Sequence, residues 1–94
     1  MHTQFGDRLM YIGGKFEPSD GGKWMESVNP ANGEVHGRVP AGTATDVNRA
    51  VQAAAAAQRE WGALSCWERG AVLRRLADAI QARGNEVVAL EAAD

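Results

Sequence analysis

The chain changes character at residue 42, and this change limits the folds that it can adopt. Residues 1–42 hold all three prolines, most of the glycines and only short β-prone runs, whereas residues 43–94 are rich in alanine and follow a helical period. Proline and glycine disfavour long helices, and alanine favours them more than any other residue. The sequence therefore predicts an α+β arrangement in which short strands precede about three helices.

Two β-hairpins are predicted over residues 8–39. In the first, the glycine pair at 13–14 separates two short runs, and glycine accepts the positive φ angles that a tight hairpin turn requires. In the second, a strand over 24–28 and a return strand over 35–39 flank a segment dense in turn residues. The Asn-Gly pair at 32–33 is expected to supply two residues with positive φ in that turn.

The helices, predicted over residues 44–94, have two strong start signals. Thr43 with Asp46, and Ser65 with Glu68, have the Ser/Thr-x-x-Asp/Glu spacing of a capping box. In this motif two residues satisfy each other's backbone N–H groups at the start of a helix. The first helix is therefore expected to begin just after Thr43 and the second just after Ser65.

Glycines and apolar stripes predict where these helices end and which sides they bury. Gly62 is expected to end the first helix, Gly84 to be the C′ residue of the second, and Asn85 to cap the third. Apolar residues recur at helical spacing, as in faces that pack against other segments. They include Val47, Val51, Ala54, Leu73, Leu76 and Ile80. A chain of this length buries only about 60–65% of its unfolded surface, so its stability alone is marginal unless these faces find a partner.

Composition and charge exclude several function classes. Charges of both signs are mixed, the net charge is -2 and no basic block is present, so no nucleic-acid partner is expected. No run of about 18 apolar residues exists for a membrane span, and residues 1–8 lack the apolar core of a signal peptide. Cys66 is the single cysteine and cannot close an internal disulfide. The sequence therefore predicts a cytoplasmic protein without a membrane or nucleic-acid partner.

Cys66 comes closest to a catalytic signal. It lies in the predicted first turn of a helix, where backbone N–H groups and the helix dipole favour a thiolate. A cysteine nucleophile also needs a base, and no pattern places His2 or His36 nearby. The histidines and the cysteine lack metal-ligand spacing, and no Gly-x-Gly-x-x-Gly loop is present. Cys66 is therefore expected to be an ordinary small side chain, and the residues alone predict no catalytic site.

Five segments, in this order and spacing, resemble the start of an aldehyde dehydrogenase. They are 11–16 (Tyr-Ile-Gly-Gly-Lys-Phe), 29–34 (Asn-Pro-Ala-Asn-Gly-Glu), 46–51 (Asp-Val-Asn-Arg-Ala-Val), 68–78 and 90–94. The resemblance covers essentially the whole chain. Within the family it is best to betaine-aldehyde dehydrogenases, on the Phe5-Gly6-Asp7 lead-in and the Arg74-Arg75 pair. Because Thr-Gly-Lys usually follows the last segment in the family, the chain is expected to be cut just before it.

The resemblance implies an α/β enzyme of the aldehyde dehydrogenase fold. Residues 1–94 would form the amino-terminal part of its NAD(P)-binding domain, and the catalytic and oligomerisation domains would be absent from this chain. The implied reaction is NAD(P)-dependent oxidation of an aldehyde, such as betaine aldehyde, to the carboxylic acid. The implied full-length protein is a homo-oligomer, a dimer or a tetramer.

All catalytic residues implied by the resemblance lie beyond residue 94. In the family a cysteine thiolate attacks the aldehyde, hydride passes to the nicotinamide, and a glutamate activates the water that hydrolyses the thioester. Cys66 does not match the family's nucleophile motif. The 94 residues alone are therefore expected to be inactive, and they decide neither the aldehyde nor the choice between NAD and NADP.

The resemblance also implies a potassium ion within each subunit. In relatives of the betaine-aldehyde type its ligands come from the two residues before the Asn-Pro turn and from the aspartate before Thr-Gly-Lys. Those positions are Ser27, Val28 and Asp94 in this chain. Carbonyls, a hydroxyl and one carboxylate suit a large hard cation. The simpler interpretation also stays open, in which Ser27 and Val28 are ordinary strand residues, Asp94 ends a helix, and no cation binds.

Two other functions stay open on the sequence. One is a non-catalytic α+β module for interaction or subunit assembly. The other is a truncation product without a function of its own.

Overall fold

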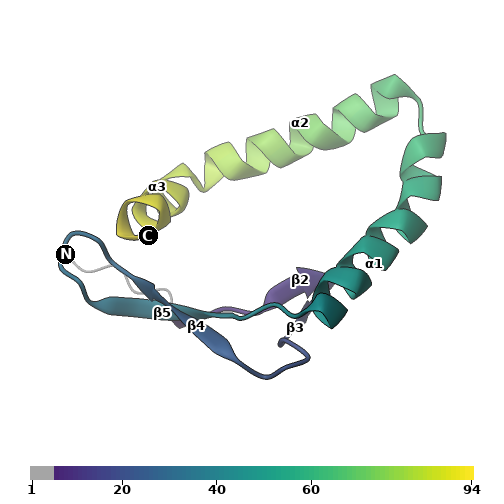
Figure 1. The fold of residues 1–94 in the computed structure, drawn as a ribbon. Coiled ribbons are helices and arrows are strands. Elements are labelled where there is room, and N and C mark those ends of the chain that lie inside the picture. Colours follow the sequence, from purple (N-terminus) through teal and green to yellow (C-terminus); the bar gives the residue numbers. More distant parts are fainter. Residues whose placement is uncertain (1–5) are drawn as a thin grey trace.

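Five short strands precede three helices in the computed structural model, which describes residues 6–94 (Figure 1). The elements are β1 (Gly6–Asp7), β2 (Met10–Ile12), β3 (Lys15–Glu17), β4 (Trp24–Val28), β5 (Val35–Pro40), α1 (Ala44–Ala63), α2 (Cys66–Ala82) and α3 (Gly84–Ala93). This order confirms the predicted α+β arrangement. His2 and Phe5, both named above, lie outside the described residues.

The first predicted hairpin forms between β2 and β3. The strands pair antiparallel with Tyr11 opposite Phe16, and the two ring centroids are 5.0 Å apart. Gly13 and Gly14 make the turn with φ angles of 61° and 81°. Residues with a Cβ disfavour this left-handed conformation, so the glycine pair is what permits so short a turn.

A third strand, which the sequence did not predict, extends the second hairpin into a sheet of order β1-β5-β4. β4 and β5 pair antiparallel as predicted, and β1 pairs parallel to β5 with Gly6 opposite Gly37. The Asp7 carboxylate holds this edge by accepting two hydrogen bonds from the Arg38 guanidinium, at 2.9 and 2.6 Å. A two-residue strand has no period of its own, which is why local pattern does not reveal it.

The turn between β4 and β5 differs from the prediction. Gly33 has a φ of 74°, but Asn32 does not have a positive φ. The Asn29 N–H donates to the Glu34 carbonyl at 2.8 Å, which closes a loop over residues 29–34. The Asn32 side chain accepts from the Glu34 N–H at 2.9 Å. This wider loop reverses the chain gradually, so it does not need the two positive φ angles of a two-residue turn.

α1 and α2 both begin at the predicted capping boxes. In α1 the Asp46 N–H donates to Thr43 Oγ1 at 3.2 Å, and the Thr43 N–H donates to the Asp46 carboxylate at 2.9 Å. In α2 the Glu68 N–H donates to Ser65 Oγ at 3.1 Å, and the Ser65 N–H donates to Glu68 Oε1 at 3.3 Å. Each box satisfies backbone donors that a helix leaves open at its start.

The predicted end of the first helix at Gly62 was wrong. Gly62 lies inside α1, which ends at Ala63, and the extended Leu64 leads directly to the next cap. Arg69 Nη1 donates to the carbonyls of Gly62 and Leu64 at 3.4 and 2.5 Å. An arginine from the following helix therefore satisfies this helix end, and no left-handed glycine is needed.

Gly84 and Asn85 also take other positions than predicted. Gly84 is the first residue of α3 and has no positive φ, and Asn85 lies inside that helix. The boundary residue is Arg83, whose N–H still donates to the Ile80 carbonyl at 3.1 Å. Its guanidinium pairs with Glu86 at 2.5 Å. Because α2 runs into α3 through this single residue, no room remains for separate C′ and cap residues.

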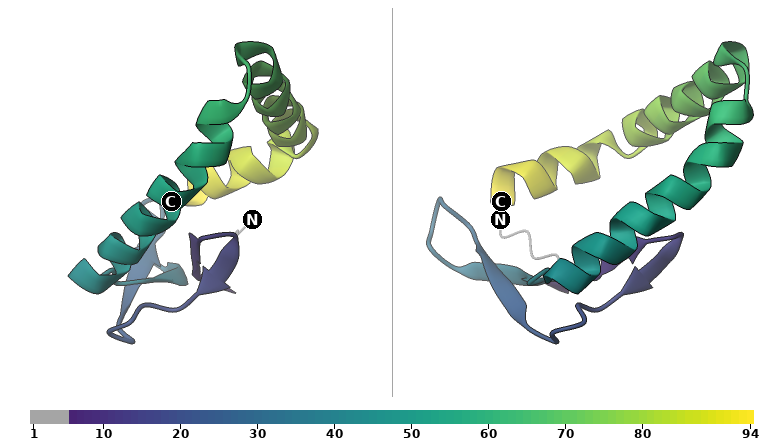
Figure 2. Two further views of the ribbon diagram at one scale, coloured as in Figure 1. Left: turned by 90° about the vertical axis from the view of Figure 1, so that its right-hand side faces the viewer. Right: turned by 45° about the vertical axis from the view of Figure 1, so that its right-hand side comes forward.

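α1 extends away from the sheet, whereas the two later helices return toward it (Figures 1 and 2). α1 and α2 form a V, and α2 and α3 run back toward the turn between β4 and β5 (Figures 1 and 2). The described residues span 47 × 34 × 16 Å with a radius of gyration of 16.6 Å, whereas a compact domain of about this size has roughly 13 Å. Among residues 6–94, Ala93 is the one buried hydrophobic residue, at 4% exposure.

The apolar stripes of the helices are consequently exposed. Val51 is 60% exposed, Leu73 and Leu76 are each 56% exposed, and Ile80 is 50% exposed. Large apolar residues exposed at helical spacing indicate a face that other segments or subunits cover. Within residues 6–94, no helix combines the length and the apolar character that a membrane span requires.

Candidate functional site

The end of α3 meets the β4–β5 hairpin through a pair of polar side chains. Ser27 Oγ donates to Asp94 Oδ1 at 2.6 Å, although the two residues are 67 positions apart in the chain. Ser27 belongs to β4, and Asp94 directly follows α3. Val28 ends β4, and its apolar side chain leaves it only a backbone carbonyl to offer. Two of the three residues predicted as cation ligands are therefore in contact, and the third adjoins them.

A β-bulge places a histidine beside this pair. The register shifts after Ser27, so that Ser27 opposes Gly37 while Val28 opposes Val35, and His36 is the extra residue. A bulge re-aims the side chains next to it. His36 is 5% exposed, and its Nε2 lies 3.0 Å from Ser27 Oγ. Ser27 thus lies between an imidazole and a carboxylate.

The sequence carried no signal for this position of His36. The bulge arises from pairing with β4, and the local pattern of β5 does not contain that information. Cys66, for which His36 was considered as a base, is exposed at the first residue of α2. In Figure 1 the start of α2 lies at the corner of the V, away from β5. The structure therefore does not bring Cys66 and His36 together.

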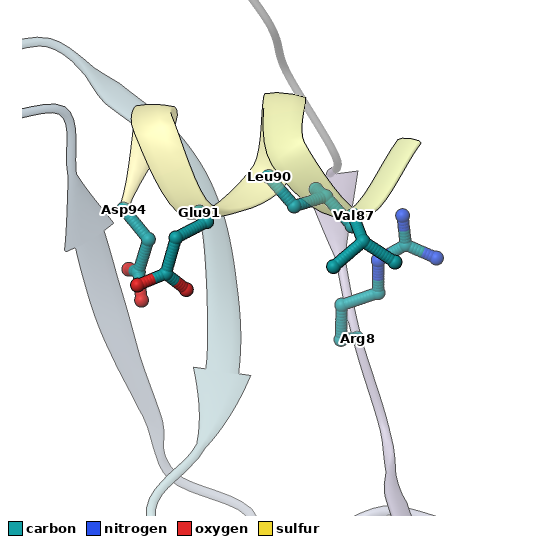
Figure 3. Close-up of a pocket in the computed structure, with 5 residues that line it drawn as sticks. All are labelled: Arg8, Val87, Leu90, Glu91 and Asp94. Atoms are coloured by element: carbon teal, nitrogen blue, oxygen red, sulfur yellow. The ribbon is translucent and has the colours of Figure 1, made fainter. Parts of the chain in front are cut away.

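A groove of about 320 Å³ adjoins the same end of α3. It is lined by Arg8, Val87, Leu90, Glu91 and Asp94. Figure 3 shows the carboxylates of Glu91 and Asp94 pointing toward the strands below α3, with Val87 beside Arg8. Both acidic side chains lie at the C-terminal end of a helix, where the helix dipole is negative. This end of the groove is therefore suited to a cation.

The donor atoms fit a large monovalent cation better than a transition metal. Within residues 6–94, no three His, Cys, Asp or Glu side chains are grouped as metal ligands. The atoms at hand are the Asp94 carboxylate, the Ser27 hydroxyl and the carbonyls of the strand end. An all-oxygen set with one charge and several carbonyls suits a hard ion such as potassium, whereas zinc sites are built mainly from histidine nitrogen and cysteine sulfur.

The described residues offer no cradle for the phosphates of a dinucleotide. Gly13 and Gly14 form a hairpin turn, and Gly22, with a φ of 68°, lies in the loop before β4. Neither segment leads into a helix N-terminus, where backbone N–H groups bind phosphate. No residue among 6–94 is therefore assigned to nucleotide binding.

A second polar cluster ties the loop before β4 to the start of α1. Asp46 is 2% exposed, and its carboxylate accepts from Ser19 Oγ at 2.6 Å and from the Asp20 N–H at 2.9 Å. Arg49 donates to the same carboxylate at 2.8 Å and pairs with Glu17 at 2.6 Å. These donors, led by the Ser19 hydroxyl, hold the pKa of Asp46 well below its ordinary value. We interpret this cluster as structural, because its hydrogen-bond donors are directed at the buried Asp46 carboxylate.

Replacing Ser19 by alanine is expected to destabilise the protein by about 1–3 kcal/mol, because the buried Asp46 carboxylate loses its closest donor. The folded-state pKa of Asp46 is lowered. Its contribution is therefore complete above the unfolded value of about 3.9 and is lost as the pH falls below that value. Urea unfolding at neutral pH and at about pH 3 measures both effects, and the gap between wild type and Asp46→Asn is expected to narrow in acid.

Asp20→Asn is the matched control for this experiment. Asp20 is an exposed carboxylate next to Ser19, but it reaches Asp46 through its backbone N–H alone. Its replacement is expected to leave the free energy of unfolding within about 0.5 kcal/mol of wild type. Equal losses in Ser19→Ala and Asp20→Asn would contradict the role given to the Ser19 hydroxyl.

Comparison with known proteins finds the same arrangement elsewhere. Residues 16–94 match the sequence model of the Aldehyde dehydrogenase family. The structure of HpcC from Thermus thermophilus matches with a TM-score of 0.91 and 33% identity over 97% of this chain. PnpE, solved in complex with nicotinamide adenine dinucleotide, matches with a TM-score of 0.88 and 37% identity over 92% of the chain. A succinate-semialdehyde dehydrogenase from Burkholderia pseudomallei matches with a TM-score of 0.76 and 39% identity over 80% of it.

The chain spans less than a fifth of each of these proteins. It covers 18% of HpcC, 18% of PnpE and 16% of the succinate-semialdehyde dehydrogenase. The hairpins and capped helices of residues 6–94 therefore correspond to one segment of much larger proteins.

Proposed function

Because the chain belongs to the aldehyde dehydrogenase family, we propose that it is the amino-terminal segment of an NAD(P)-dependent enzyme that oxidises an aldehyde to the carboxylic acid. The observation that carries this proposal is the fold, since nearly the whole chain matches one segment of HpcC. The family match over residues 16–94 supports the same reaction class, and the nucleotide bound to PnpE supports the cofactor class.

The reacting groups are proposed to lie in the remainder of the protein. The bound nicotinamide supplies a hydride acceptor in the family's reaction. The described residues provide neither a cysteine beside a base nor a phosphate cradle, and Cys66 is exposed. This segment therefore serves as support. We place it on the outside of the NAD(P)-binding domain, where the stripes of α1 and α2 are covered by other segments.

Betaine aldehyde is the proposed substrate for the first assay, because of the resemblance at Phe5-Gly6-Asp7 and Arg74-Arg75. Succinate semialdehyde is the comparison substrate, since a similar protein is named for it. The full protein is mixed with each aldehyde and with NAD or NADP, and reduction of the nicotinamide is followed by absorbance. The ranking of kcat/KM identifies the preferred aldehyde. If no aldehyde in a broad panel leads to reduction of the nicotinamide, the proposed dehydrogenase activity is wrong.

The full protein is proposed to be a cytoplasmic homo-oligomer, a dimer or a tetramer. The exposed apolar stripes of the helices supply surface that neighbouring segments or subunits need. A single cysteine fits a reducing compartment, where proteins do not rely on disulfides. Sedimentation of the full protein measures the oligomeric state directly.

A potassium ion is proposed to bind where Ser27, Val28 and Asp94 meet. The support for this site is the direct contact between Ser27 and Asp94, which closes the end of α3 onto β4. The negative end of the α3 dipole and the neighbouring Glu91 carboxylate add attraction for a cation. Ser27 and Asp94 would contribute side-chain oxygens, and the end of β4 would contribute carbonyls.

Asp94→Asn is expected to raise the half-saturating potassium concentration by about tenfold or more, because it removes the one charge that contacts the site while keeping an oxygen acceptor for Ser27. Activity of the full protein is measured against potassium chloride, with choline chloride keeping the ionic strength constant. Glu91→Gln is the comparison variant and is expected to give a smaller rise, since Glu91 lines the same groove without a hydrogen bond to Ser27. An unchanged potassium dependence in Asp94→Asn would speak against the site.

A further inference from the structure

The hydroxyl of Ser27 has two hydrogen-bond partners but a single hydrogen. Its Oγ lies 2.6 Å from Asp94 Oδ1 and 3.0 Å from His36 Nε2. A carboxylate only accepts, so the hydroxyl hydrogen goes to Asp94. The contact with His36 then requires the imidazole to donate from Nε2 to the oxygen of Ser27. The structure is thus the state in which Asp94 takes the hydroxyl hydrogen.

A cation held jointly by Ser27 Oγ and Asp94 Oδ1 would require the opposite arrangement. Cations bind oxygen lone pairs, and a hydrogen lying between Ser27 and Asp94 occupies the side of both oxygens that such an ion needs. The hydroxyl must then turn its hydrogen toward another acceptor. His36 Nε2 is already within hydrogen-bond distance, and a neutral imidazole accepts at Nε2 in its other tautomer.

We propose that His36 is a positioning residue for the cation site, acting as the alternative acceptor that lets the Ser27 hydroxyl turn away from Asp94. The inference rests on the proposed potassium site and adds to it the group that prepares the ligand. His36 acts through Ser27, with which it shares a hydrogen bond. Without that acceptor, the hydroxyl hydrogen stays on the cation's side and weakens binding.

Two features of the fold make His36 suited to this role. Its burial at 5% exposure limits the access of water that would otherwise accept the hydrogen. The bulge after Ser27 makes His36 the extra residue of β5 and so aims it at Ser27. A histidine that merely filled space would need neither the bulge nor a nitrogen at this distance.

Glutamine and asparagine separate this role from space filling. A glutamine amide reaches about as far along the side chain as Nε2 and both donates and accepts, whereas an asparagine amide reaches only as far as Nδ1. His36→Gln is therefore expected to keep the potassium response. His36→Asn and His36→Leu are expected to raise the half-saturating potassium concentration by about tenfold, the effect of one lost hydrogen bond.

The test measures the thermal midpoint of the full protein against potassium chloride, with choline chloride keeping the ionic strength constant, so it does not depend on activity. A wild-type midpoint that ignores potassium would overturn the potassium site, and this inference with it. A potassium response in wild type that His36→Asn and His36→Leu share would leave the site standing and overturn the role of His36. If His36→Leu does not fold, the comparison of His36→Gln with His36→Asn decides alone.

Discussion

Expressed on its own, the 94-residue chain is expected to self-associate rather than to unfold as a cooperative monomer. Among residues 6–94 the buried hydrophobic core consists of Ala93. Leu73, Leu76 and Ile80 are each half exposed or more, and full burial of such a side chain stabilises a fold by about 1.5–3 kcal/mol. Folded domains have net stabilities of only about 5–15 kcal/mol. The exposed stripes therefore leave too little burial to hold the chain together as a monomer.

Analytical ultracentrifugation and thermal melting by circular dichroism test this expectation on the isolated chain. Leu76→Glu is expected to increase the monomeric fraction, because it interrupts the stripe of α2 with a charge. Arg75→Gln, one residue away among the polar positions of α2, is expected to leave association unchanged. A sharp and reversible melting transition of monomeric wild-type chain would show that the exposed stripes do not govern its behaviour.

The elements that the sequence predicted are those whose causes are local. Each capping box is a contact between residues three positions apart, so the starts of α1 and α2 can be read without knowing the fold. The Gly13-Gly14 turn depends only on the φ angles that glycine accepts. The resemblance to aldehyde dehydrogenases supplied what local chemistry does not contain, namely the proposed reaction class and the three positions proposed as cation ligands.

Two of the errors concern features that depend on residues outside the element itself. Gly62 was expected to end α1, but Arg69 from the next helix satisfies those carbonyls instead. The strand β1 exists through its pairing with β5 and through the contact of Asp7 with Arg38. Contacts between separate elements leave no mark in the pattern of either element, so propensity and spacing miss them.

In the candidate site, too, some residues could be named from the sequence and one could not. Ser27, Val28 and Asp94 could be named from the resemblance because they flank recognisable segments, and the structure brings Ser27 and Asp94 into contact. His36 could not be named, because a bulge between β4 and β5 decides where its ring lies. His36 is thus the residue of the candidate site whose position depends on the pairing of β4 with β5 rather than on its spacing in the sequence.

In the full protein, Leu76→Glu is expected to have the opposite effect from its effect on the isolated chain. If other segments cover the α2 stripe, the substitution buries an unpaired carboxylate and leaves the space of a leucine poorly filled. Together these are expected to cost about 3–5 kcal/mol, which appears as loss of soluble protein or a much lower thermal midpoint. Arg75→Gln, the polar neighbour, is expected to stay within about 0.5 kcal/mol of wild type.

The informative result is that Leu76→Glu has opposite effects on the isolated chain and on the full protein. A charge that helps the isolated chain and damages the full protein places the stripe of α2 inside the larger fold, as expected for a supporting segment of a dehydrogenase. A full protein that carries Leu76→Glu with an unchanged midpoint and a changed oligomeric state would instead place the stripe on an assembly surface. That outcome would favour the non-catalytic interaction module, because the stripe would then serve contacts between chains rather than the interior of one enzyme subunit.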